Sequence, residues 1–340
     1  MATSPRMSQL YTRLAAINVD KPFVKNVVLP DWWDDEMAAT DAGYARGLGI
    51  ISQHLGVDLR QLWDDTAPIK YPACGKTNFK LNASLTKADV EWAKSVALSA
   101  AKFAARETKQ PLRALPSAKS IRDQIIKAGA SCVDLPRLLE FLWDHGIPVL
   151  HIDAKPKGAK KMAGLAARIE GRPVIVLSKN HPYNSLMLFD LAHELGHILR
   201  KHIDGDAVLI DAKIERDGQT DPQEVEANEA ALEVLTGRTT LQFTHRNRYV
   251  KGEALAKMAV ATGKTENIDP GVVAQNFAFG RDFFAVAGAA CKIIEGDKSP
   301  VRLIEQMLLN NVDFANLADE DAEFLMKVAV TGEPNAVAAR

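Results

Sequence analysis

The sequence LAHELGHILRKH, residues 191–202, places two histidines four positions apart, with a glutamate directly after the first. Positions i and i+4 of an α-helix lie on the same face, so the imidazoles of His193 and His197 can bind one ion together. Glu194 lies one step round the helix, where it can act as general base on a water molecule bound to that ion. The HExxH spacing therefore predicts a helix that carries a catalytic metal site, with Zn²⁺ as the expected ion and Mn²⁺ as the alternative.

The residues around this motif are mostly apolar, which predicts that the helix is buried. The surrounding apolar residues are Leu186, Met187, Phe189, Leu191, Ala192, Leu195, Ile198 and Leu199. Two imidazoles and a carboxylate buried without partners would cost several kcal/mol, and a metal ion removes that cost. The alternative is that both histidines are exposed, or are core residues satisfied by ordinary hydrogen bonds.

Catalytic zinc usually takes three protein ligands and one water molecule, so a third ligand is needed. A second helix is expected from about Asp221, a suitable N-cap, to Gly237, a suitable helix terminator. Its candidate acids are Glu224, Glu226, Glu229 and Glu233. We choose Glu226 because it directly precedes a face of small residues suited to close helix packing, namely Ala227, Ala230, Ala231 and Val234. Glu229, one turn further on, is then a candidate for orienting a ligand.

Other polar residues near the motif could assist the chemistry. Asp190 lies one turn before His193 and could accept the second N–H of an imidazole. Hydrolysis also needs a donor for the negative charge that develops on the substrate carbonyl oxygen. The candidates near the motif are His181, Tyr183, His202 and His245.

The remaining pattern predicts an α+β fold with helical flanks. Apolar residues recur mostly at helical spacing, and three short runs are instead typical of strands. The expected strands are residues 149–153, 164–169 and 173–178. The last two are separated by Glu170-Gly171-Arg172, and a short turn with glycine between such runs indicates a β-hairpin.

Composition and charge exclude a strongly basic nucleic-acid-binding protein. The net charge is −1 over 340 residues, with 47% hydrophobic and 25% charged residues. Residues 55–62, LGVDLRQL, are similar to the closing helices of phage-repressor-type helix-turn-helix domains. However, residues 31–65 contain eight acidic residues against Arg46 and Arg60, and phosphate contacts need the opposite sign. We therefore expect no direct binding of nucleic acid, and an acidic helical module that docks on the rest of the chain or on a protein partner.

Cysteine usage and hydropathy indicate a reducing cytoplasm. Cys74, Cys132 and Cys291 are scattered and form no CxxC pair, so each is expected to be a small buried residue. No window approaches the roughly 18 apolar residues of a membrane span, and the first twenty residues lack the apolar core of a signal peptide. A membrane is therefore not an expected partner.

Three stretches together resemble the ImmA/IrrE family of metallopeptidases. They are GLAARIEGRPVIVLSKN (164–180), FDLAHELGHIL (189–199) and EVEANEAALEVL (224–235). The order of a strand hairpin, an AHELGH helix and an E-A-N helix is similar to that family over about residues 117–240. The resemblance implies a zincin-like α+β core, with His193, His197 and Glu226 as metal ligands and Glu194 as catalytic acid/base.

The resemblance also implies an organisation and a function. The expected regions are a helical N-terminal region (1–110), a zincin-like metallopeptidase core (111–240) and a helical C-terminal region (241–340). The implied activity is a zinc-dependent metalloendopeptidase that cuts a regulatory partner such as a helix-turn-helix repressor, in a stress, phage or toxin-antitoxin context. One alternative is a non-proteolytic metal-binding module for regulation or protein interaction, and the presence of Glu194 favours the peptidase over it. A DNA-binding regulator is a third interpretation, disfavoured by the acidic N-terminal region.

Overall fold

Helices account for most of the chain, and they pack around one small sheet. The computed structural model describes residues 4–72, 87–156, 164–203, 208–211, 221–243, 250–279 and 283–331. The α-helices are α1 (Pro5–Ala15), α2 (Lys21–Phe23), α3 (Asp41–Leu55), α4 (Leu59–Trp63), α5 (Lys87–Arg106), α6 (Ala118–Lys127), α7 (Leu135–Asp144), α8 (Asn184–Leu199), α9 (Pro222–Thr236), α10 (Gly252–Glu266), α11 (Pro270–Phe279), α12 (Phe284–Glu295), α13 (Pro300–Asn311) and α14 (Asp319–Ala329). Short π- and 3-10-helical segments are η1 (Val24–Val28), η2 (Asp35–Ala39) and η3 (Phe314–Asn316). The α+β class expected from the sequence is confirmed.

The sheet has four strands in the order β1-β3-β2-β4. Its strands are β1 (Val149–His151), β2 (Gly164–Ile169), β3 (Arg172–Leu177) and β4 (Val208–Asp211). Strand β1 is parallel to β3, whereas β2 is antiparallel to both β3 and β4. The predicted hairpin is confirmed: Glu170 and Gly171 both have positive φ, 50° and 83°, as a two-residue type I′ turn requires. Strand β4 was not predicted from the sequence.

Both faces of β2 and β3 are buried, and they belong to two different cores. Leu165, Ala167 and Ile169 of β2 point into a core shared with α5. Ala166 of the same strand, and Ile175 of β3, point into the second core, which contains α8. This arrangement follows from the period of two along a strand, and it explains why these strands read as continuous apolar runs.

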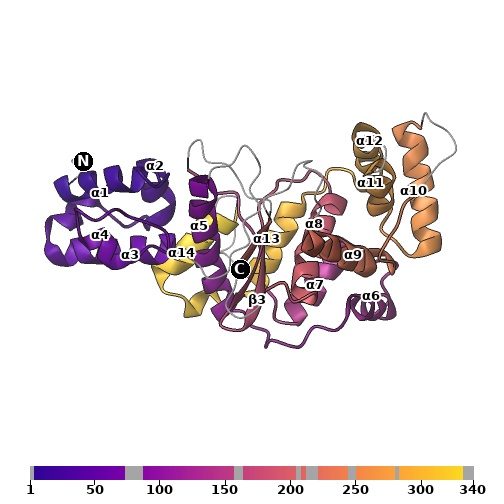
Figure 1. Cartoon of the computed structure of the whole chain (residues 1–340), viewed down its shortest axis with the longest axis horizontal. Coiled ribbons are helices and arrows are strands. Elements are labelled where there is room, and N and C mark those ends of the chain that lie inside the picture. Colours follow the sequence, from indigo (N-terminus) through magenta and orange to yellow (C-terminus); the bar gives the residue numbers. More distant parts are fainter. Residues whose placement is uncertain are drawn as a thin grey trace.

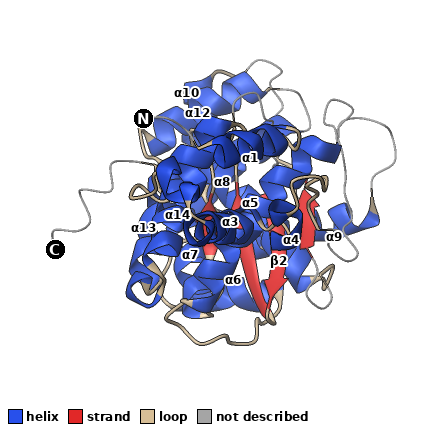
Figure 2. Cartoon of the chain, turned by 90° about the vertical axis from the view of Figure 1, so that its left-hand side faces the viewer, coloured by secondary structure: helices blue, strands red, loops and turns tan. Residues whose placement is uncertain are grey.

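The molecule is elongated, with α1–α4 at one end and α10–α12 at the other (Figure 1). The view along the long axis shows helices on both sides of the strands (Figure 2). Helix α14, from the C-terminal part of the chain, packs in the core of the N-terminal helices. There the buried His54 ring contacts Asp321 (Nε2 to Oδ1, 2.9 Å) and stacks on Phe324. The N-terminal region therefore shares its core with α14, and the division of the chain at 110 and 240 stays a prediction.

Local signals explain several helix ends. Gly56 ends α3 with φ of 62°, and Gly237 ends α9 with φ of 76°, both in the left-handed region that glycine adopts readily. The Asp221 side chain accepts a hydrogen bond from the backbone N–H of Gln223 and so caps α9. Cys291 is buried as expected and Cys132 is partly exposed, while Cys74 lies outside the described residues. Over the described ranges, every helix is too short or too polar to cross a membrane.

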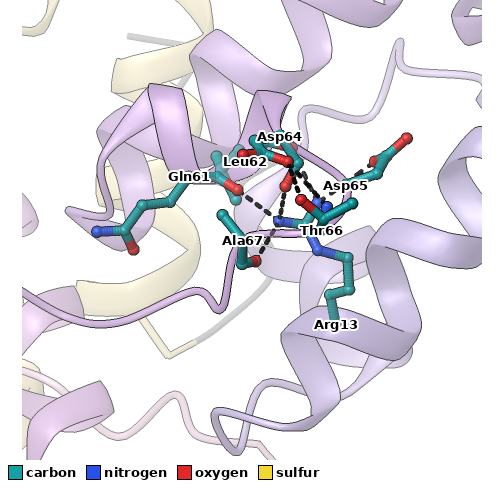
Figure 3. A network of polar contacts seen from close by, with 7 residues as sticks. All are labelled: Arg13, Gln61, Leu62, Asp64, Asp65, Thr66 and Ala67. Carbon is teal, nitrogen blue, oxygen red and sulfur yellow. Dashed lines mark hydrogen bonds and ion pairs between the residues drawn. The ribbon is translucent and has the colours of Figure 1, made fainter.

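One arginine joins α1 to the end of α4 (Figure 3). The guanidinium of Arg13 donates to the backbone carbonyls of Leu62 (3.0 Å) and Asp64 (2.7 Å). It also donates to the carbonyls of Gln61 and Ala67. The carbonyls of Gln61 and Leu62 belong to the last turn of α4, where they have no partner within the helix, and the cation also opposes the negative end of the helix dipole.

We expect Arg13→Met to lower the free energy of unfolding by about 2–3 kcal/mol, because hydrogen bonds to charged groups contribute most when they are removed from a largely buried site. Hydrogen exchange should rise in residues 59–67, and urea denaturation should show the loss. Arg13→Lys should retain more of the stability than Arg13→Met but less than the wild type, since an ammonium cannot span four carbonyls. Arg60→Met is the matched control because the Arg60 side chain is 94% exposed. Equal effects of the two methionine variants would contradict the role of Arg13 in holding the end of α4.

The C-terminal helices hold the N-terminus of α8. Glu295, the last residue of α12, accepts hydrogen bonds from the backbone N–H groups of Asn184 (2.5 Å) and Ser185 (3.3 Å). Nearby, Asp269 caps α11 by accepting from the N–H of Val272 (3.0 Å). Burial raises the pKa of Asp269 to about 6, and the negative charge of Glu295 adds to this.

The raised pKa of Asp269 makes the stability of the folded protein depend on pH. The folded protein binds the Asp269 proton more tightly than the unfolded chain does. The stabilisation that results is complete at low pH and is lost as pH rises through about 6. Asp269→Asn keeps the cap and removes the titration. We expect the variant to be more stable than the wild type at pH 8 by on the order of 1 kcal/mol, and the difference to shrink at pH 5. Denaturant titrations at both pH values test this, with the exposed Asp297→Asn as control. A pH-independent difference would contradict it.

Candidate metal centre

The HExxH helix is buried, as predicted. Helix α8 carries His193, Glu194 and His197, whose exposed fractions are 7%, 2% and 0%. The interpretation of these histidines as exposed surface residues is therefore wrong. Two imidazoles and a carboxylate in the core of the protein need hydrogen-bond partners or a metal ion.

Three side chains, those of His193, His197 and Glu224, converge on one point beside α8. The Nε2 atoms of His193 and His197 are 3.1 Å apart. The two carboxylate oxygens of Glu224 lie 3.2 Å from His193 Nε2 and 3.5 Å from His197 Nε2. Ligands at 2.0–2.1 Å from a tetrahedral metal ion are separated by about 3.3–3.4 Å, so this spacing fits one such ion. Two neutral imidazoles and one carboxylate are also the donor types that zinc prefers.

The structure places Glu224, and not Glu226, beside the two imidazoles, so the candidate third ligand differs from the choice made from the sequence. Glu226 is 53% exposed, and its carboxylate contacts the ring of His202 instead (Oε2 to Nε2, 2.9 Å). The physical reason is helical periodicity. Glu224 precedes the buried Ala227 by three residues and Asn228 by four, so it continues the packed face of α9 toward the N-terminus. Glu226 is adjacent to Ala227 in sequence, and adjacent residues point about 100° apart on a helix.

A glycine inside the motif lets the two helices meet. A Cβ atom at Gly196 would lie 2.4 Å from the carbonyl oxygen of Ala227, so only glycine permits the observed contact between α8 and α9. The small-residue face predicted for α9 is confirmed, since Ala227, Ala230, Ala231 and Val234 are all buried. The close crossing at Gly196 brings the first turn of α9, and with it Glu224, to the two imidazoles.

The second nitrogen of each imidazole also has a partner. His193 Nδ1 lies 3.0 Å from Oδ1 of Asn228, the residue one turn after Glu224 on the same face of α9. His197 Nδ1 lies 2.9 Å from Nδ1 of His202. Such outer partners orient metal-binding histidines and select their tautomer. Glu229, expected in this role, forms no side-chain hydrogen bond or ion pair within the described part of the chain.

Asp190 has a different role from the one expected. Its Oδ2 accepts hydrogen bonds from Lys179 Nζ and His181 Nε2, both at 2.7 Å, and not from an imidazole of the HExxH motif. Burial alone would raise the pKa of Asp190, but the hydrogen bond from His181 and the charge of Lys179 outweigh it and hold that pKa below its usual value. Asp190 therefore stays ionised and ties the segment after β3 to α8, one turn before Glu194.

The four candidate donors for the substrate carbonyl lie in different places. His202 contacts His197 and Glu226, and His181 contacts Asp190. Tyr183 is the residue before the first turn of α8. His245 lies outside the described residues.

Glu194 is held against the first residue of β2. A Cβ atom at Gly164 would lie 2.2 Å from Oε1 of Glu194, so this carboxylate occupies space that any larger residue would fill. Gly164 pairs with Leu177 of β3 and with Asp211 of β4. The proposed general base therefore lies at the end of the sheet where the first residue of β2 meets the last residues of β3 and β4.

Comparison with known protein families gives a match that covers this region. Residues 143–262 match a peptidase family model described as "IrrE N-terminal-like domain". The match spans less than half of the chain and includes α8 and α9, which carry all four residues of the site. No curated protein and no solved structure shows a significant similarity to the chain.

Proposed function

Residues 143–262 of this chain belong to the ImmA/IrrE family of metallopeptidases, and we propose that the protein is a zinc-dependent metalloendopeptidase. The observation that carries this proposal is the convergence of His193, His197 and Glu224, whose ligand atoms all lie within 4.8 Å of one another. Glu194 directly follows His193 on α8. In this proposal the sheet, α8 and α9 form a zincin-like core.

The chemistry follows from the positions of these side chains. A divalent ion held by the two imidazoles and Glu224 would lower the pKa of a water molecule and polarise a peptide carbonyl. Glu194 accepts the proton from the attacking water and then returns it to the nitrogen of the leaving amine, so no net proton is consumed by the residue. Asn228 keeps the His193 ring in the orientation that directs Nε2 toward the ion.

The substrate proposed here is a regulatory protein, such as a helix-turn-helix repressor, cut at a specific bond. The family resemblance supports this class of substrate and a stress, phage or toxin-antitoxin context. The acidic character of residues 31–65 supports recognition of a protein rather than of nucleic acid by the N-terminal helices. Zinc is proposed over manganese because the donor set contains two imidazole nitrogens.

The test compares cells of the source organism that express the wild-type protein with cells that express Glu194→Gln. Mass spectrometry of protein N-termini should show new termini in one or a few proteins only with the wild type. The cleaved protein, purified and incubated with the enzyme and Zn²⁺ or Mn²⁺, should give the same fragments. Metal binding without any new terminus, together with equal phenotypes of the two strains, would instead support the non-proteolytic metal-binding module.

A further inference from the structure

The end of α8 returns the chain toward the metal centre. Lys201 adopts the left-handed conformation, with φ of 58°, and the backbone N–H of His202 donates to the carbonyl of His197 (3.0 Å). This bond between residues five apart is the hydrogen bond of a Schellman motif, in which glycine usually occupies the left-handed position. A lysine there is conformationally unfavourable, and such positions persist where the surrounding structure determines them.

This turn places the His202 ring directly behind the His197 ring. The two Nδ1 atoms are 2.9 Å apart, and His202 Nε2 lies 2.9 Å from Oε2 of Glu226. The His202 side chain is only 5% exposed, whereas that of Glu226 is 53% exposed. A continuous row of polar contacts therefore leads from the buried His197 to a carboxylate at the surface.

The contacts leave one consistent assignment of protons. His197 Nε2 faces the point where the Nε2 atom of His193 and the Glu224 carboxylate converge, so it must present a lone pair in order to bind a metal ion. The proton of His197 is then on Nδ1 and is donated to His202 Nδ1. His202 consequently carries its own proton on Nε2 and donates it to Glu226. In this row His197 donates a hydrogen bond to His202, His202 donates one to Glu226, and Glu226 only accepts.

We infer that His202 is a positioning residue of the metal centre, which fixes the tautomer and orientation of His197 and is itself oriented by Glu226. This inference rests on the proposed metal-binding function and adds two residues that act on the metal only through His197. It also accounts for the unfavourable conformation of Lys201, because that turn delivers the His202 ring to its place.

The test measures metal affinity by competition with a chromophoric chelator for Zn²⁺, and the visible absorption spectrum of the Co²⁺-loaded protein. His202→Leu removes the acceptor at similar volume, and we expect a loss of zinc affinity of about 10- to 100-fold, the range typical of outer partners of metal-binding histidines. The Co²⁺ spectrum should change because the His197 ring is no longer held. His202→Asn should recover most of the affinity, since the asparagine Oδ1 occupies nearly the position of histidine Nδ1 and can accept the same proton.

Three further variants test this role against a merely structural one. Glu226→Gln retains an oxygen acceptor and should stay within a few-fold of wild-type affinity. Glu229→Gln, on the same helix, is the matched control and should have no effect. Thermal unfolding of each metal-free variant detects any loss of folding, and Lys201→Gly, which suits the left-handed turn, should preserve both stability and affinity.

The inference is overturned if folded His202→Leu binds zinc as tightly as the wild type with an unchanged Co²⁺ spectrum, or if His202→Asn is as defective as His202→Leu. Either result leaves the proposed peptidase intact. Failure of the proposed function is a different observation, namely that the wild-type protein itself binds no divalent metal or cleaves no protein.

Discussion

The Glu194→Gln variant is expected to bind zinc as tightly as the wild type and to cleave its protein substrate at least about 10²-fold more slowly, the lower end of the contribution of a positioned general base. The amide has almost the same shape as the carboxylate, so the space beside Gly164 is still filled. It cannot accept the proton of the attacking water, and the rate falls for that reason alone. Zinc titration and the initial rate of fragment formation, measured on the same preparations, test both parts.

The separation of binding from turnover is what identifies the role of Glu194. A variant that lost metal and activity together would assign this carboxylate to the metal-binding set. A variant with wild-type turnover would remove Glu194 from the mechanism, and with it the enzymatic proposal. Glu229→Gln provides the control for removing one negative charge from the neighbouring helix.

The second large effect is expected at Glu224. Glu224→Gln replaces an anionic donor by a neutral amide in contact with both imidazoles, so zinc affinity should fall by more than about 100-fold, the upper limit typical of residues that act only through a ligand. Glu226→Gln is the matched variant two positions away and should retain affinity within a few-fold. Equilibrium zinc titration and metal content after gel filtration measure the difference between the two variants.

This pair of variants decides between the residue chosen from the sequence and the residue placed by the structure. A large loss at Glu226 with none at Glu224 would mean that α9 is rotated about its axis from the observed position. Such a rotation would also move Asn228 away from His193, so the contact between Nδ1 and Oδ1 at 3.0 Å would not form. Equal losses at both positions would indicate that both carboxylates bind the ion.

Much of the local structure follows from short-range signals. The expected strand at residues 164–169 has the observed bounds of β2. The run expected as a strand at 173–178 begins one residue earlier in the structure, as β3. Periodicity, caps and glycines act over a few residues, which explains why they could be interpreted without knowledge of the fold. Strand β4 is four residues long and pairs with β2, which lies about forty residues earlier in the chain. Its only local signal is the apolar run at residues 208–210, and so short a run cannot be told from part of a helix by periodicity alone.

The sequence by itself determined the HExxH helix, its burial and its two imidazoles, because these depend on the spacing of four residues within one helix. It also indicated that the next helix, α9, supplies the third candidate ligand, since that helix begins at a clear cap and holds the nearby acids. Only the tertiary structure decided which acid faces the imidazoles. The crossing of α8 and α9 at Gly196 and Ala227 sets the rotation of α9, and this contact joins residues about thirty positions apart. The same crossing places Asn228 against His193. The turn at Lys201 places His202 against His197, and Glu226 contacts His202.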